Sequence, residues 1–131
     1  MAQLLVDTSA VYALIDRDDT CHRKAVALLR SLPRRGLRPL LTNFIVAESH
    51  ALLLSRLGPE IARDWLLRQI WPVERITPED EEKAREIIRR YTDKSFSYTD
   101  ATSFVVMERL GIKEAFAFDP HFRQYGFKLL S

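Results

Sequence analysis

The first ten residues, MAQLLVDTSA, constrain the fold more than any other stretch of the chain. Residues 3–6 form a short apolar run that ends at Asp7, and a helical pattern begins directly afterwards. A buried run of this length, followed at once by a helix, predicts the first strand of an α/β domain. The Asp7 carboxylate would then lie at the carboxyl end of that strand, where open parallel sheets bind their ligands.

Strand and helix patterns alternate along the rest of the chain. Further strands are predicted at residues 39–42, 73–77, 115–118 and 127–130, and helices at 9–15, 20–32, 44–57, 60–70, 78–91 and 98–110. Thr20 and Asn43 are expected to cap the second and third helices. This alternation predicts a mostly parallel sheet with helices on both faces. With 131 residues and no linker or internal repeat, residues 1–131 are expected to form a single domain.

Composition excludes several classes of protein. A chain with 47% hydrophobic and 29% charged residues is typical of a globular domain, and neither disordered nor collagen-like. The longest uncharged stretch, residues 39–47, is far shorter than the roughly 20 apolar residues that span a bilayer. No signal-peptide pattern is present, and the single cysteine, Cys21, cannot form an internal disulfide. We therefore expect a cytoplasmic protein without a membrane segment.

The formal net charge of +2 conceals a larger basic excess if four acids share one site. The remaining 14 acidic side chains would then face 20 basic ones, an excess of +6. Basic residues crowd into two places: Arg30, Arg34, Arg35 and Arg38 in one, and Arg85, Arg89, Arg90 and Lys94 in the other. A basic surface around an acidic hole suits a polyanionic substrate, although solvated helix faces explain the same residues.

Three aspartates have two interpretations each. Asp7 could cap the helix after it, Asp100 could form a capping box with Ser97, and Asp119 could cap a short turn at 120–125. Alternatively, all three converge. Asp7 and Asp119 both follow short apolar strands, and Asp100 opens the helix that leads into the second of those strands. In a parallel sheet, the three carboxylates would lie at the same edge.

Glu48 lies in the stretch NFIVAESHALLL, where the residues three and four positions away on either side are all apolar. It would therefore face the core, and a glutamate is almost never fully buried without a partner. A divalent cation shared with other carboxylates would supply the opposite charge that keeps Glu48 ionised. The helix could instead expose Glu48 at its edge, beside Ser49 and His50.

Oxygen ligands indicate Mg²⁺ or Mn²⁺, because zinc sites favour cysteine and histidine. His22, His50 and His121 match no zinc spacing, and His50 and His121 are expected at the surface or beside the ligands. Thr8, Ser9 and Thr99 flank the acids as hydrogen-bonding or capping partners. A cation held by carboxylates suits phosphoryl chemistry, because it activates water and neutralises charge on the phosphate. The glycine-rich phosphate loops GxGxxG and GxxxxGK[ST] are absent.

Four segments together resemble the PIN-domain family, and the resemblance covers essentially the whole chain. They are Asp7-Thr8-Ser9-Ala10, the helix containing Glu48, Ser97-Tyr98-Thr99-Asp100-Ala101, and Phe118-Asp119 after a short strand. The resemblance implies a Rossmann-like three-layer α/β/α sandwich with a mostly parallel five-stranded sheet. It also implies an Mg²⁺- or Mn²⁺-dependent endoribonuclease, whose catalytic and metal-binding residues would be Asp7, Glu48, Asp100 and Asp119. Asp7 and Asp100 would be the most direct ligands.

Stand-alone PIN domains of this size are similar to the VapC toxins of toxin–antitoxin pairs. The resemblance implies an RNA substrate, a homodimer, and a VapB-type antitoxin that places a peptide in the active-site groove. A non-catalytic PIN-like module that binds RNA or protein is the alternative. Aspartyl-phosphate enzymes fit poorly. Ser9 stands where a haloacid-dehalogenase phosphatase has its second aspartate. A receiver domain needs an acidic pair at the first strand and a lysine near the last strand, whereas this chain has one acid there and Lys128 lies inside the last predicted strand.

Overall fold

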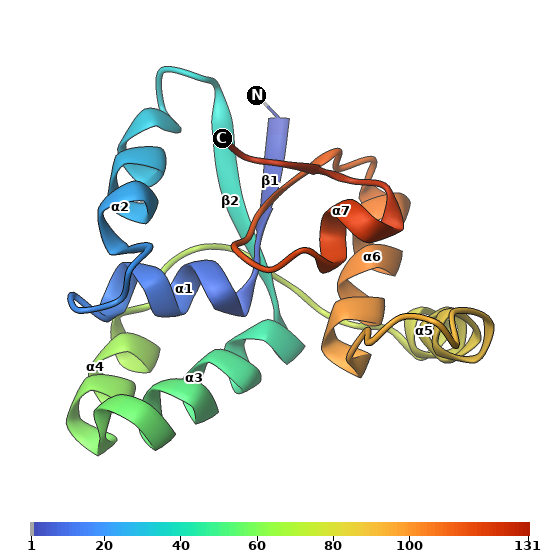
Figure 1. Cartoon of the computed structure of the whole chain (residues 1–131), viewed down its shortest axis with the longest axis horizontal. Coiled ribbons are helices and arrows are strands. Elements are labelled where there is room, and N and C mark those ends of the chain that lie inside the picture. Colours follow the sequence, from blue (N-terminus) through green and yellow to red (C-terminus); the bar gives the residue numbers. More distant parts are fainter. Residues whose placement is uncertain (1) are drawn as a thin grey trace.

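Five strands and seven helices alternate in the computed structural model, which describes residues 2–131 (Figure 1). In chain order they are β1 (Ala2–Val6), α1 (Thr8–Ile15), α2 (His22–Ser31), β2 (Leu37–Thr42), α3 (Asn43–Leu57), α4 (Pro59–Arg68), β3 (Val73–Glu74), α5 (Pro78–Arg90), α6 (Tyr98–Leu110), β4 (Glu114–Phe116), α7 (His121–Tyr125) and β5 (Lys128–Leu129). The strands lie in the order β3-β2-β1-β4-β5, and every pairing is parallel. The prediction of an α/β fold with a parallel sheet is therefore correct.

Helices cover both faces of this sheet. In Figure 1, α1 and α2 lie on one side of β1 and β2, whereas α5, α6 and α7 lie on the other. β1 is the central strand, so Leu4, Leu5 and Val6 are completely buried, and this explains their continuous apolar run. Helix α6 is buried from Asp100 to Met107. No helix within residues 2–131 has both the length and the apolar character needed to cross a bilayer.

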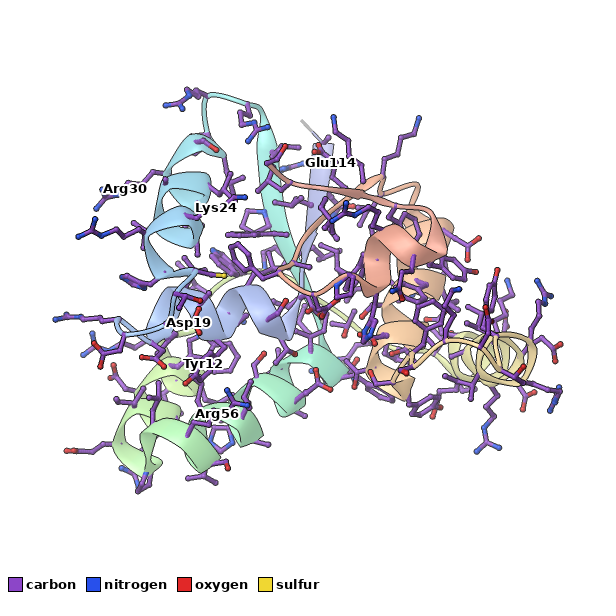
Figure 2. The ribbon with its side chains drawn as sticks, in the orientation of Figure 1. Tyr12, Asp19, Lys24, Arg30, Arg56 and Glu114 are labelled. Carbon is purple, nitrogen blue, oxygen red and sulfur yellow. The ribbon has the colours of Figure 1, made fainter. Side chains whose placement is uncertain are left out.

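Side-chain contacts also join the helices to one another. Helix α3 packs on α1, where the Arg56 guanidinium lies over the Tyr12 ring, 5.3 Å from its centroid (Figure 2). The Tyr12 hydroxyl donates a hydrogen bond to Asp16 at 2.5 Å, at the end of α1. These contacts help to hold α3 beneath the carboxyl ends of the strands, where the candidate acids lie.

The predicted caps of two helices are wrong. Thr42, not Asn43, caps α3 by accepting a hydrogen bond from the Ile45 N–H at 3.1 Å. The Asn43 side chain instead accepts from the Ile76 N–H at 2.8 Å, a contact with the segment after β3. Helix α2 begins after Cys21 with no side-chain cap, so Thr20 does not serve this role. In α3, both Thr42 and Asn43 satisfy the sequence pattern of a cap, and the contact of Asn43 with the Ile76 N–H leaves Thr42 as the cap.

Strand β3 is shorter than predicted, because the end of the predicted segment already belongs to the start of α5. Thr77 caps α5 in a reciprocal capping box: its hydroxyl accepts from the Asp80 N–H, and the Asp80 carboxylate accepts from the Thr77 N–H, both at 3.0 Å. Backbone groups engaged in a helix cap cannot also extend a strand ladder. The sheet therefore ends there after two residues, Val73 and Glu74.

Arg109 of α6 ties α5 and β3 together. Its Nε and Nη2 atoms lie 3.1 and 2.8 Å from the two carboxylate oxygens of Asp80, and its Nη1 lies 2.8 Å from Glu74 Oε2. The Asp80 side chain is only 3% exposed. Burial by itself would raise the pKa of Asp80, but hydrogen bonds from Arg109 and from the Thr77 backbone hold that pKa below its ordinary value.

Replacing Arg109 with Ala should lower the free energy of unfolding by about 2 kcal/mol, because the buried Asp80 carboxylate loses its paired cation. Arg109→Lys should recover only part of this loss, since a lysine cannot donate the same two-pronged hydrogen bond. Urea denaturation monitored by circular dichroism measures both. Arg89→Ala, which breaks an exposed pair with Glu86, is the control and should change stability by less than about 0.5 kcal/mol. Equal losses in the Arg109 and Arg89 variants would contradict this assignment.

Candidate active site

The candidate site lies where the strand order of the sheet changes direction. From β1 the chain passes to β2 on one side, and β4 later pairs with the other side of β1. Asp7 directly follows β1, and Asp119 lies three residues after β4. The Asp7 N–H donates to the Phe116 carbonyl at 2.9 Å, so the ends of these two strands are joined. Crevices at such switch points are where open parallel sheets bind ligands.

Asp7 caps α1 and also faces the crevice. Its Oδ2 atom accepts hydrogen bonds from the Ser9 N–H at 3.1 Å and from the Ser9 hydroxyl at 2.7 Å. The same hydroxyl oxygen accepts from the Phe118 N–H at 2.9 Å. Ser9 therefore clamps the Asp7 carboxylate against the segment after β4. The capping interpretation of Asp7 is correct, and it does not exclude convergence with Asp119.

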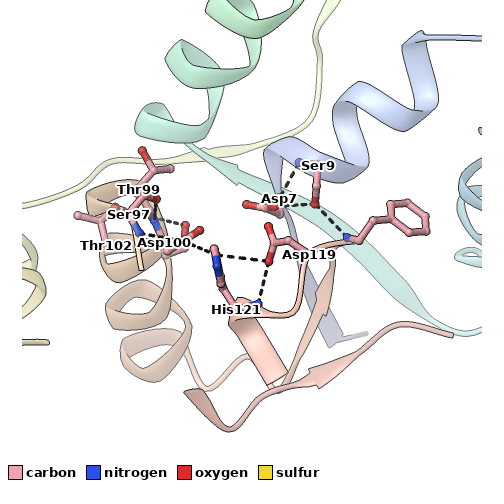
Figure 3. Close-up of polar contacts among 10 residues, drawn as sticks. Asp7, Ser9, Ser97, Thr99, Asp100, Thr102, Asp119 and His121 are labelled. Carbon is pink, nitrogen blue, oxygen red and sulfur yellow. Dashed lines mark hydrogen bonds and ion pairs between the residues drawn. The ribbon is translucent and has the colours of Figure 1, made fainter. Parts of the chain in front are cut away.

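His121 lies between the other two aspartates (Figure 3). Its Nδ1 atom is 2.7 Å from Asp100 Oδ2 and 3.8 Å from Asp119 Oδ1. Asp100 also forms the predicted capping box with Ser97, and Asp119 accepts from the His121 N–H at 3.0 Å. One ligand atom from each of Asp100, Asp119 and His121 lies within 4.8 Å of the others, a spacing that a single metal ion could bridge.

Too much negative charge is confined in this space for all the carboxylates to ionise easily. Burial raises the pKa of Asp7 well above its ordinary value, and the charge of the neighbouring Asp119 raises it further, against the opposing hydrogen bonds from Ser9. Burial also raises the pKa of Asp100, although the Ser97 backbone and His121 oppose this. A divalent cation would supply the missing positive charge, and carboxylate oxygens are the donors that hard cations prefer. These residues therefore fit such an ion.

Glu48 lies between the two alternatives that the sequence left open, a side chain facing the core and one exposed at the helix edge. It is half-buried, not enclosed, because α3 turns Ile45, Ser49 and Leu53 into the core and leaves Glu48 at the boundary of that face. It forms no hydrogen bond or ion pair with any residue of the described chain 2–131. The adjacent Ser49 hydroxyl donates to the Thr8 hydroxyl at 3.4 Å, so Glu48 lies where α3 meets the first turn of α1. Contacts therefore join three of the four predicted acids, Asp7, Asp100 and Asp119, whereas Glu48 makes no hydrogen bond or ion pair with them within residues 2–131.

The sequence prediction placed His121 at the surface or beside the ligands, and in the structure its ring lies against the Asp100 carboxylate. In the sequence, His121 stands two residues after Asp119, and the Asp119 carboxylate accepts a hydrogen bond from the His121 N–H. What the sequence could not supply was the approach of Asp100, which lies 21 positions earlier in the chain. His121 Nδ1 is buried, and within residues 2–131 its close contact with Asp100 lacks the alignment of a hydrogen bond. A buried ring nitrogen in contact with a carboxylate but without an aligned partner fits a position beside a bound ion.

His121→Ala should reduce cleavage and Mn²⁺ affinity by about tenfold, because side chains that orient metal-binding carboxylates are typically worth tenfold to a hundredfold. Isothermal titration calorimetry with Mn²⁺ and a cleavage assay measure the two quantities. Gln124→Ala, an exposed change on the same short helix, is the matched control and should leave both unchanged. Wild-type Mn²⁺ affinity in the His121 variant would show that this side chain has no part in the site.

Residues 4–128 match the PIN domain. The chain belongs to the PIN-domain family. Among curated relatives, the 23S rRNA-specific endonuclease VapC20 from two Mycobacterium tuberculosis strains, CDC 1551 / Oshkosh and H37Rv, is 36% identical over 127 residues, which are 95% of this chain and 95% of the relative. A crystal structure of Mycobacterium tuberculosis VapC20, described as a sarcin–ricin loop cleaving toxin, matches with a TM-score of 0.87 at 35% identity and covers 95% of both chains. These likenesses confirm the predicted family and the PIN-domain α/β fold.

Proposed function

We propose that this protein is a metal-dependent endoribonuclease of the VapC type that cleaves the sarcin–ricin loop of 23S rRNA. The class of enzyme is that of its relatives and agrees with the sequence prediction. The narrower substrate is supported by the 36% identity, over 95% of the chain, to a 23S rRNA-specific endonuclease whose crystal structure is described as that of a sarcin–ricin loop cleaving toxin. Convergence of Asp7, Asp100 and Asp119 at one edge favours catalysis over a PIN-like module that only binds.

Asp7, Asp100 and Asp119 would hold the metal ion, Mg²⁺ or Mn²⁺, with Glu48 contributing from the edge of α3. A bound divalent cation supplies Lewis acidity, which activates water and neutralises charge developing on the phosphate. Ser9 fixes the orientation of the Asp7 carboxylate, and His121 holds the Asp100 carboxylate toward the crevice. The burial of Asp7 limits competing hydration, so the site is arranged before the substrate arrives.

The experiment incubates the purified protein separately with intact ribosomes, protein-free 23S rRNA and bulk tRNA, each with Mg²⁺ and with EDTA. Primer extension then maps the cut positions. The proposal predicts Mg²⁺-dependent cleavage confined to the sarcin–ricin loop, and none by the Asp100→Asn variant. If tRNA were cleaved and the sarcin–ricin loop of the 23S rRNA stayed intact, the proposed substrate would be wrong. If EDTA did not diminish cleavage, the metal-dependent mechanism would be wrong.

Protein partners are the second part of this proposal: a VapB-type antitoxin and a second copy of the chain, in the cytoplasm. An apolar groove of about 390 Å³ is lined by residues of α1, α2 and α4 and by the half-buried Trp65 and Trp71. Ile70, which lines this groove, is 89% exposed, and Leu67, nearby in the sequence, is 76% exposed. Exposed apolar surface of this kind is typical of protein contacts. Light scattering of the purified protein measures whether it is a dimer, and a monomeric mass would remove the homodimer from this proposal.

A further inference from the structure

A second groove, of about 450 Å³, is lined by residues of α2, the segment directly after β4, α7 and the C-terminal segment that contains β5. Its lining contains three basic side chains, Lys24, Arg123 and Lys128, and no aspartate or glutamate. Figure 2 shows Lys24 on α2, far along the chain from the other two. We call the cavity lined by these three side chains the basic groove. Tertiary structure alone brings them together.

The three cations of the basic groove are free to bind an external anion. All three residues are exposed, and none forms an ion pair with another residue of the described chain 2–131. Glu114 lies opposite Lys128 in the β4–β5 register, yet no ion pair joins them. By contrast, the groove between α5 and α6 mixes its lysine and arginines with Glu86 and Glu108. Unpaired like charges around a concave surface create a positive potential there.

The basic groove adjoins the candidate active site. Phe118 lines the groove, directly precedes Asp119, and donates its N–H to the Ser9 hydroxyl that holds Asp7. Arg123 lies on α7, two residues after His121. One short segment, residues 118–123, therefore contributes Asp119 to the candidate active site and Arg123 to the groove.

We propose that the basic groove binds the phosphate backbone of the RNA on one side of the scissile bond. Lysine and arginine contacts to phosphates position a nucleic acid without reading its sequence, and this suits a surface that adjoins the cutting site. Phe118 and Phe127, both half-buried in the groove lining, add apolar surface beside the charges. The inference rests on the proposed function, because it takes RNA as the substrate.

The charges predict a specific dependence on salt. Each phosphate neutralised by a cation contributes about 0.7 to 0.9 to the slope of log K against log salt concentration. Replacing Lys24, Arg123 and Lys128 together with Ala should reduce that slope by about 2 and weaken RNA binding by at least about tenfold at moderate salt. In the active enzyme the same triple variant should raise KM and leave kcat close to the wild-type value.

Binding is measured in EDTA by fluorescence anisotropy, with an end-labelled rRNA hairpin that contains the sarcin–ricin loop. All proteins carry Asp7→Asn so that the RNA stays intact. The control triple Arg17→Ala, Arg63→Ala and Lys83→Ala removes the same charge from exposed residues outside the groove. A third variant, Lys24→Arg, Arg123→Lys and Lys128→Arg, keeps the charge and should restore the salt slope. Thermal denaturation shows whether each variant is folded.

Loss of slope and affinity in the groove triple, absent from the control triple and restored by the charge-preserving variant, supports the inference. An equal loss in both alanine triples would reveal a general charge effect and overturn it. A wild-type enzyme that cleaves the hairpin, with a groove triple of unchanged slope and KM, would overturn the basic groove and leave the proposed function standing. A wild-type enzyme that neither binds nor cleaves RNA would overturn both.

Discussion

Replacing Asp7 with Asn should abolish RNA cleavage and, at the same time, make the metal-free protein more stable. Cleavage should fall at least about 100-fold, because the variant loses a carboxylate that would hold the divalent cation, and the cation supplies the Lewis acidity for the reaction. Stability should rise because burial and the neighbouring Asp119 make ionised Asp7 unfavourable, and the raised pKa of Asp7 records that penalty. Asn removes the charge but keeps a side-chain oxygen that can still accept from Ser9 and cap α1. The gain should be on the order of 1 kcal/mol at neutral pH.

Urea denaturation in EDTA measures the stability, and gel electrophoresis of cleaved RNA measures the activity. Asp7→Ala separates the two roles of the residue, since it removes the cap as well as the charge. It should be less stable than Asp7→Asn by about 1 kcal/mol while being equally inactive. Asp18→Asn, at an exposed position, should change neither quantity. If Asp7→Asn destabilised the metal-free protein, the conclusion that ionised Asp7 is unfavourable in the folded state would be wrong.

Removing divalent cations should abolish cleavage and change the sign of the pH dependence of stability. The folded-state pKa values of Asp7 and Asp100 are raised, so the metal-free folded protein binds protons more tightly than the unfolded chain does. Its free energy of unfolding should therefore increase as the pH falls through those raised values, at a pH above the ordinary carboxyl range. With Mn²⁺ bound, the carboxylates remain ionised, and acidification should instead release the ion and lower stability.

Asp80 titrates in the opposite direction. Its folded-state pKa is lowered, so its contribution to stability is present above the ordinary carboxyl pKa and is lost as the pH falls through the lowered value. The stabilisation from Asp7 and Asp100 should therefore appear at higher pH than the loss from Asp80. Thermal denaturation across this pH range, with EDTA and with Mn²⁺, measures both. The double variant Asp7→Asn with Asp100→Asn should lose the rise in EDTA; a rise that persisted would assign it to other groups.

Sequence alone determined the architecture and three of the candidate acids. The apolar run of β1 indicated a strand buried on both faces. The alternation of strand and helix patterns along the chain indicated a parallel sheet. In a sheet of parallel strands, the residues that follow the strands lie at one edge of the sheet. The sequence therefore predicted that Asp7 and Asp119 lie close together. The cap that Asp7 forms on α1 and the hydrogen bond from the His121 N–H to Asp119 were also local, because each joins residues two positions apart.

Only the tertiary structure decided how Glu48 and His121 are placed. A helical pattern shows which residues share a face, but the packing of α3 against α1 selects Ser49 for the interior and leaves Glu48 at the boundary. His121 meets Asp100 because α7 follows β4 back toward the start of α6, a contact between separate segments of the chain. The basic groove depends in the same way on α2 lying opposite β5. Local chemistry determines caps and strands, whereas contacts between distant segments depend on how whole elements pack.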